Sequence, residues 1–189
     1  IYELRDDMLV IADAEKAVGI AGVMGGIDTE VTEATTDVLI EAARFTPLNI
    51  RRTARALKLS SDAGFRFERG VDPLGVDMAS RRAARLILDL AGGTLAPGVV
   101  SVGDTGEPNR PITLRLSRCN QLLGTELSLD EVAALLDRLG LDPQADASAQ
   151  TVTCTPPSFR LDLHREVDLI EEVARCHGLA NIETQDKMP

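Results

Sequence analysis

The stretch PPSFRLDLHREVDLIEEVARCHG, residues 156–178, decides how the C-terminal part of this chain folds. A proline-led, strand-like segment is predicted to end at Asp162, and a helix is predicted to follow it. Asp168, Glu171 and Glu172 are spaced i, i+3 and i+4, so they share one face of that helix. Asp162 directly precedes the helix and can reach the same point in space.

Two interpretations of these four acids stay open on spacing alone. Carboxylates gathered around one point repel one another unless a cation lies between them, and magnesium binds a few carboxylates together with water. Alternatively the acids form a solvated helix face, since acidic groups favour a helix N-terminus and Glu171 precedes Arg175 by four residues. Short spacing motifs often match by chance, which favours the solvated face.

Length and composition indicate a water-soluble globular protein. The 189 residues give room for one large or two small domains, and the shares of 44% apolar and 26% charged residues are ordinary. No run of 18 apolar residues occurs, so no membrane span is expected. The chain begins at Ile1 in what reads as mid-domain sequence, and we therefore expect it to be a piece of a longer protein.

Cysteine usage gives no sign of a metal site or a disulfide framework. Cys119, Cys154 and Cys176 are odd in number and far apart in the sequence. This usage suits the reducing cytoplasm, and each cysteine is expected to serve as a small buried apolar residue.

Charge is unevenly distributed along the chain, whose formal net charge is −10. Residues 44–69 hold seven basic side chains against two acidic ones, which makes this segment the one plausible place for phosphate contact. A solvated helix face is the alternative. The basic residues are Arg44, Arg51, Arg52, Arg55, Lys58, Arg66 and Arg69.

Hydrophobic patterns predict short strands and two helices in the first part of the chain. The apolar runs 8–12, 18–24 and 37–45 are typical of buried strands. The residues 48–57 form a basic helical pattern, and 78–91 form a longer helix that ends at a glycine pair.

The second part is predicted to follow a linker rich in Gly, Pro and polar residues at 103–111, with the boundary near residue 108. Its predicted order is strand, helix, helix, hairpin and helix, which is typical of a winged helix. Ser128 and Glu131 form a capping box for the second of these helices, predicted to end at Gly140. Eight basic and fourteen acidic side chains follow residue 104, so we expect protein contact here and no DNA binding.

Four motifs in order give a more specific signal. PSFRLD with EVDLIEEVARCHGLANI resembles a signature of the bacterial phenylalanyl-tRNA synthetase beta subunit, although Val167 stands where an acid is common. Residues 22–26 (GVMGG), 38–47 (VLIEAARFTP) and 60–73 (SSDAGFRFERGVDP) resemble the editing domain of that family. The resemblance covers nearly the whole chain.

The resemblance implies an α+β fold with two parts. Residues 1–104 would be the C-terminal part of a partial α/β editing domain, 105–111 the linker, and 112–189 a winged-helix-like domain that contacts the alpha subunit. The implied enzyme is a cytoplasmic α₂β₂ tetramer that attaches phenylalanine to tRNA-Phe with ATP and hydrolyses mischarged Tyr-tRNA-Phe. ATP would bind to the alpha subunit, and the chain alone need not be active.

The resemblance also implies roles for individual residues. Glu41 would bind the tyrosine hydroxyl, Gly25 would let the backbone approach the substrate, and Ser61 and Ala63 would line the pocket. No catalytic residue is certain, and a positioned water is the expected nucleophile. The family's editing histidine would lie before Ile1. Magnesium shared with the alpha subunit would bind Asp162, Asp168, Glu171 and Glu172.

A non-catalytic interpretation remains as the alternative. In it the chain is a scaffold or protein-docking module with a fold like that of nucleic-acid-binding domains, and the acidic helix only docks a partner.

Overall fold

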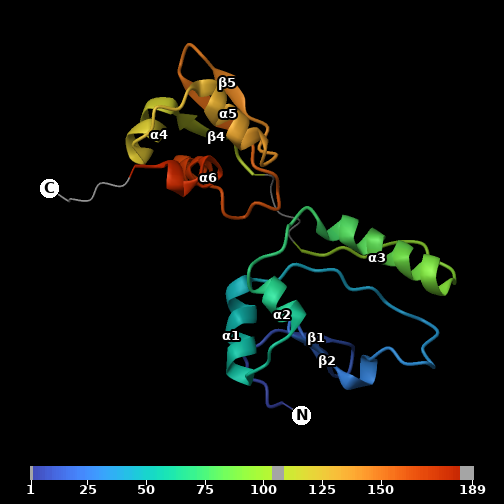
Figure 1. Ribbon diagram of the computed structural model, residues 1–189. Helices are drawn as coiled ribbons and strands as arrows, with labels where there is room; N and C mark the ends of the chain where they lie inside the picture. The colour runs from blue at the N-terminus through green and yellow to red at the C-terminus, as the bar shows by residue number, and fades with distance from the viewer. Residues whose placement is uncertain (1, 104–108, 184–189) are drawn as a thin grey trace. The chain divides into compact units, whose positions relative to one another are not determined.

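The computed structural model describes residues 2–103 and 109–183 of this chain (Figure 1). Two compact units, Ile1–Gly106 and Glu107–Pro189, are each described by themselves. Each unit combines helices with a three-stranded antiparallel sheet, which confirms the predicted α+β class. Residues 105–108 of the predicted linker lie outside the described residues.

The sheet of the first unit consists of β1 (Val10–Ala12), β2 (Ala17–Ile20) and β3 (Met24–Gly25), in that spatial order. The prediction of one strand over 18–24 was wrong, because a turn interrupts the run. Gly22 adopts a left-handed φ of 64°, and the N–H of Val23 donates to the carbonyl of Ile20. The chain therefore reverses at this turn, and β3 pairs with β2.

Four helices follow the sheet strands of this unit. They are the 3-10 helix η1 (Ile27–Thr29), α1 (Pro47–Leu57), α2 (Asp62–Phe67) and α3 (Val76–Ala91). Proline at the first position suits α1 because its missing N–H would have no helical partner there. The predicted helices over 48–57 and 78–91 are confirmed, and Figure 1 shows β1 and β2 close to α1 and α2.

A long irregular excursion connects η1 to α1. The strand predicted over 37–45 is absent: residues 36–46 have no regular structure. An edge strand needs a neighbour to satisfy its backbone groups, and no described strand pairs with this run. The side chain of Leu39 is accordingly 99% exposed.

The core of the first unit is small. Val23, Ile50 and Ala54 are buried together, and Phe45 and Phe67 pack against them. α3 has no buried residue, and Leu90 on it is exposed. None of the described helices is both long and apolar enough to cross a membrane.

The second unit follows the predicted order of elements. Ser128 and Glu131 form the predicted capping box, although α5 ends three residues before Gly140. The strand-like segment predicted to end at Asp162 is instead a series of turns, in which Arg160 N–H donates to the Pro157 carbonyl. The elements are β4 (Ile112–Arg115), α4 (Leu116–Leu123), α5 (Leu129–Asp137), β5 (Gln144–Asp146), β6 (Thr151–Cys154), α6 (Glu166–His177) and η2 (Leu179–Asn181).

A continuous core fills the second unit between the sheet and its helices. Leu114 of β4, Leu136 of α5 and Leu169 of α6 are fully buried in it. Cys119 and Cys154 are also buried there, and burial raises the pKa of each thiol to about 11. These two cysteines therefore behave as the predicted small apolar residues, since an un-ionised thiol is a poor nucleophile.

Truncation of a core leucine tests this packing. We expect Leu136→Ala to lower the free energy of unfolding of the second unit by about 2–5 kcal/mol, because it leaves a cavity. Leu122→Ala is the control, since that leucine is exposed on α4, and it should change the value by about 0.5 kcal/mol or less. Urea unfolding followed by circular dichroism measures both, and equal effects would contradict the assigned core.

Candidate functional site

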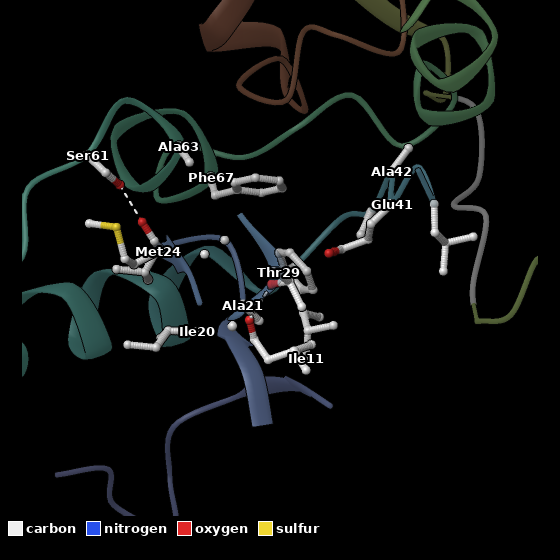
Figure 2. Close-up of a pocket in the computed structure, with 18 of the residues that line it drawn as sticks. Ile11, Ile20, Ala21, Met24, Thr29, Glu41, Ala42, Ser61, Ala63 and Phe67 are labelled. Carbon is white, nitrogen blue, oxygen red and sulfur yellow. Dashed lines mark hydrogen bonds between the residues drawn. The ribbon is translucent and has the colours of Figure 1, made fainter. Parts of the chain in front are cut away.

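An open hollow of about 1390 Å³ lies in the first unit. The β2–β3 hairpin, the irregular excursion and α2 contribute its walls. Gly25, Glu41, Ser61 and Ala63, the residues that the family resemblance singled out, all line it. Figure 2 shows Ser61 and Ala63 on one side of the hollow and Glu41 on another.

Ser61 has a structural role besides lining the hollow. Its hydroxyl donates to the carbonyl oxygen of Val23 at 2.6 Å and accepts from the N–H of Gly64 at 3.0 Å. The first bond fixes α2 to the β2–β3 turn, and the second caps the N-terminus of α2. Because the hydroxyl proton is used in the first bond, Ser61 is a wall of the hollow and not its nucleophile.

Two neighbouring glycines serve different purposes. A Cβ built on Gly26 would lie 2.3 Å from the carbonyl oxygen of Val18, so the hairpin itself requires that glycine. A Cβ on Gly25 would meet nothing within 4 Å, and Gly25 has no positive φ. The fold therefore does not require glycine at position 25, and the space beside it is available to a ligand.

Glu41 lies in the irregular excursion and not on a strand as predicted. It is exposed, which corrects the expectation of a carboxylate placed between apolar residues of a strand. Its carboxyl end points into the hollow (Figure 2). Within the described part of the chain it has no ion-pair partner, so its oxygens are available to accept hydrogen bonds.

An aromatic pair, which sequence reasoning missed, lines the same hollow. The rings of Phe45 and Phe67 lie 5.1 Å apart between their centroids and are tilted by 50°. Phe45 lies in the motif 38–47 and Phe67 in the motif 60–73, both of which drew attention for other residues. The one feature of the sequence that could have pointed to this pair is the scarcity of aromatic residues. The chain has only four phenylalanines, and two of them meet here. Such rings can pack against an aromatic substrate side chain.

The charged side chains that line the hollow are all acidic among the described residues. No lysine, arginine or histidine lines it. A surface of this sign favours a cationic group such as an ammonium and disfavours a phosphate. The acidic residues are Asp28 and Asp62, which pair with Lys16 and Arg66, together with Glu30, Asp37, Glu41 and Asp72.

The second candidate site, on α6, has a different arrangement from the predicted metal cluster. Asp168 accepts from the backbone N–H groups of His164 and Arg165, at 2.9 and 2.7 Å, and so caps the helix. Burial raises the pKa of Asp168, but these bonds and the Arg165 side chain outweigh it, and the pKa is lowered overall.

Glu172 is the centre of an ion-pair network. This glutamate is 7% exposed, and its two oxygens accept from Arg160 at 3.0 Å and from Arg175 at 2.5 Å. Arg160 also binds Asp162, at 2.6 and 2.9 Å. Burial raises the pKa of Glu172, whereas the two guanidinium groups lower it by more, so the carboxylate stays charged.

The four predicted metal ligands are therefore not brought together as a cluster. No group of three or more His, Cys, Asp or Glu side chains in the described residues could hold a metal ion. Arg160 occupies the position of a cation between Asp162 and Glu172, while Glu171 is exposed. Arg175 pairs with Glu172 and not with Glu171 as the spacing suggested. In this arrangement the acids do not fit a magnesium ion.

The glycine pair yields a stability prediction. Gly26→Ala should lower the free energy of unfolding of the first unit by about 1–3 kcal/mol, because its Cβ collides with backbone. Gly25→Ala should change it by about 0.5 kcal/mol or less. Thermal unfolding of the two variants measures the difference, and a destabilised Gly25→Ala variant would show that this glycine is structural.

The Glu172 network predicts a pH dependence. Because its folded-state pKa is lowered, its contribution to stability is complete above the ordinary glutamate pKa of about 4.3 and is lost as pH falls through the lowered folded-state pKa. Glu172→Gln should destabilise the second unit by about 3 kcal/mol at pH 7 and flatten the decline in acid. Glu171→Gln is the matched control. Urea unfolding from pH 3 to pH 7 measures both variants. Equal behaviour of the two variants would contradict the stabilising role of the network.

Comparison with known protein families assigns each unit. The B3/4 domain family matches residues 1–92, and the tRNA synthetase B5 domain family matches residues 112–179.

Whole-chain similarity agrees with these matches. The phenylalanine–tRNA ligase beta subunit of Rhodopirellula baltica is 50% identical over 188 residues, which are 100% of this chain and 27% of that protein. The beta subunit of Salinibacter ruber is 49% identical over 99% of this chain and 22% of its own length. The chain spans about a quarter of the length of these curated relatives. It therefore belongs to the bacterial phenylalanine–tRNA ligase beta subunit family, of which it carries a B3/4 domain followed by a B5 domain.

Proposed function

We propose that this chain acts within a phenylalanine–tRNA ligase and that the hollow of its first unit removes tyrosine from mischarged tRNA-Phe. Residues 1–104 are the editing part in this proposal, and 112–189 form the winged-helix-like domain that contacts the alpha subunit. The parent reaction is the ATP-dependent attachment of phenylalanine to tRNA-Phe in protein synthesis.

One observation carries the proposal. Gly25, Glu41, Ser61 and Ala63 come from three separate segments, yet all of them line one hollow. The hollow also offers what a tyrosyl ester requires. Phe45 and Phe67 can pack against its ring, and the acidic lining favours its α-ammonium group.

Selection for tyrosine follows from one hydroxyl group. A hydrophobic synthetic pocket rejects an added hydroxyl only weakly, by ~10²-fold, so a second site is required. The Glu41 carboxylate can accept a hydrogen bond from the phenol. Phenylalanine offers no such donor, and a desolvated carboxylate without a partner costs about 1–3 kcal/mol or more. The hollow would therefore bind the tyrosyl ester in preference to the phenylalanyl ester.

Hydrolysis requires a nucleophile, and water is the candidate. The Ser61 hydroxyl is engaged by Val23 and Gly64, and neither cysteine nor histidine lines the described hollow. Attack of water on the ester carbonyl breaks the bond to the tRNA and releases free tyrosine. The open side of the hollow admits that water, while Glu41 and the aromatic pair orient the amino acid.

The remaining components of the proposed ligase lie outside this chain. The beta-subunit name of its relatives implies an alpha subunit and tRNA-Phe as partners, and we propose an α₂β₂ tetramer with ATP on the alpha subunit. Asp162, Asp168, Glu171 and Glu172, the acids expected to share magnesium with that subunit, do not fit the ion in this arrangement. Arg160 binds Asp162 and Glu172, and the backbone N–H groups of His164 and Arg165, which precede α6, donate to Asp168. The free cysteines fit a cytoplasmic location.

Substitution of Glu41 tests the proposal. In the complete ligase, Glu41→Ala should lower kcat/KM for deacylation of Tyr-tRNA-Phe by about 10- to 100-fold, because the phenol loses its charged acceptor. Attachment of phenylalanine should be unchanged. Deacylation of purified Tyr-tRNA-Phe, followed by release of labelled tyrosine, measures the effect.

Glu33→Ala is the matched control. Glu33 is an exposed glutamate of the same excursion that does not line the hollow. If both variants edited as well as the unaltered ligase, the chain would have the alternative role of a non-catalytic scaffold.

A further inference from the structure

The basic residues of α1 form a distinct surface on the first unit. α1 and its C-cap residue Lys58 contain no acidic side chain. Arg51 and Arg55 are spaced i and i+4 on one face of α1, and Lys58 follows the helix as its left-handed C-cap residue. All three are exposed, whereas Ile50 and Ala54 face the core. We call these three residues the α1 stripe.

The α1 stripe has no neutralising partner in the part of the chain that the structure describes. None of its three side chains makes an ion pair or a side-chain hydrogen bond there. Like charges on one helix face and at the residue that caps it repel one another. An external anion would relieve that repulsion.

Several other exposed cations of the same unit have a carboxylate partner. Arg81 and Arg85 on α3 each lie beside an aspartate one turn away, at 2.8 and 2.9 Å. Lys16 is paired with Asp28. In a chain with 30 acidic and 20 basic residues, a helix that carries only cations is not explained by the average composition.

The stripe ends close to the hollow. Lys58 is three residues before Ser61, a distance of about 10 Å at most along the chain. Ser61 lines the hollow, and its bond to Val23 fixes that connection to the hairpin. α1 also packs on the hairpin through Ile50 and Val23. The stripe and the hollow are therefore parts of one packed unit.

We infer that the α1 stripe binds phosphates of the tRNA backbone next to the 3′ end whose amino acid occupies the hollow. This inference rests on the proposed function. The substrate carries an ammonium at the amino acid and a row of phosphates behind it. The unit presents acidic groups in the hollow and a cationic helix beside it, which is the complementary order.

The test neutralises the stripe in the complete ligase. Arg51→Gln, Arg55→Gln and Lys58→Gln are combined, because glutamine keeps helix propensity while it removes charge. Equilibrium binding of tRNA-Phe as a function of salt is measured first. We expect the slope of log K against log salt to become shallower by about 2 to 3, since three phosphate contacts are lost. The KM for Tyr-tRNA-Phe deacylation should rise about tenfold or more.

A small substrate separates this inference from the proposed function. The 3′-tyrosyl ester of adenosine lacks the tRNA backbone, so its hydrolysis should be the same in the triple variant and the unaltered ligase. If the unaltered ligase hydrolyses neither substrate, the proposed function fails while the binding measurement still decides the inference.

Charge-matched controls complete the test. Arg51→Lys with Arg55→Lys keeps the charges and should retain the salt slope. Arg82→Gln removes an exposed arginine of α3 and should leave the slope unchanged. An unaltered slope in the triple variant would overturn the inference. Dissociation of the ligase subunits with undiminished RNA affinity would also overturn it and identify the stripe as a protein contact.

Discussion

The bond from the Ser61 hydroxyl to the Val23 carbonyl is the interaction on which the candidate site depends. Val23 belongs to the small core of the first unit, and its turn joins β2 to β3. The same hydroxyl caps α2, which contributes Ala63 and Phe67 to the lining of the hollow. One side chain therefore sets the distance between the two regular walls. A larger core could fix this distance by packing, but three buried residues cannot fix it alone.

Charge is divided differently in the two units. In the second unit, guanidinium groups neutralise the acids at the start of α6, and Glu172 is held between Arg160 and Arg175. In the first unit, carboxylates face the hollow while the cations of α1 face outward without partners among the described residues. The ion pairs of the second unit stabilise its fold, whereas the first unit leaves charged side chains available to a ligand. For this reason we propose that the first unit contacts the substrate and that the α6 network has a structural role.

The sequence predicted the elements whose signals are local. The capping box at Ser128 and Glu131, the basic helix of 48–57 and the helix before Gly92 depend on short-range chemistry and were confirmed. The run 37–45 reads as a strand, but a strand depends on a distant partner that composition does not reveal, and the run is irregular. Spacing placed Asp168, Glu171 and Glu172 on one helix face, with Asp162 before the helix, yet it could not show that Arg160 lies between Asp162 and Glu172. Resemblance identified residues of the hollow, while Phe45 and Phe67 emerged only from the packing.

The most direct measurement is a structure of the complete ligase with 3′-tyrosylamino-adenosine, an analogue whose amide replaces the ester and resists hydrolysis. We expect its phenol oxygen within hydrogen-bond distance of the Glu41 carboxylate and its ring against Phe45 and Phe67. The ammonium should face the acidic lining, and the backbone of Gly25 should lie against the analogue. An analogue bound elsewhere, or bound in the hollow with its phenol far from Glu41, would contradict the assignment of this hollow as the tyrosine-selecting site.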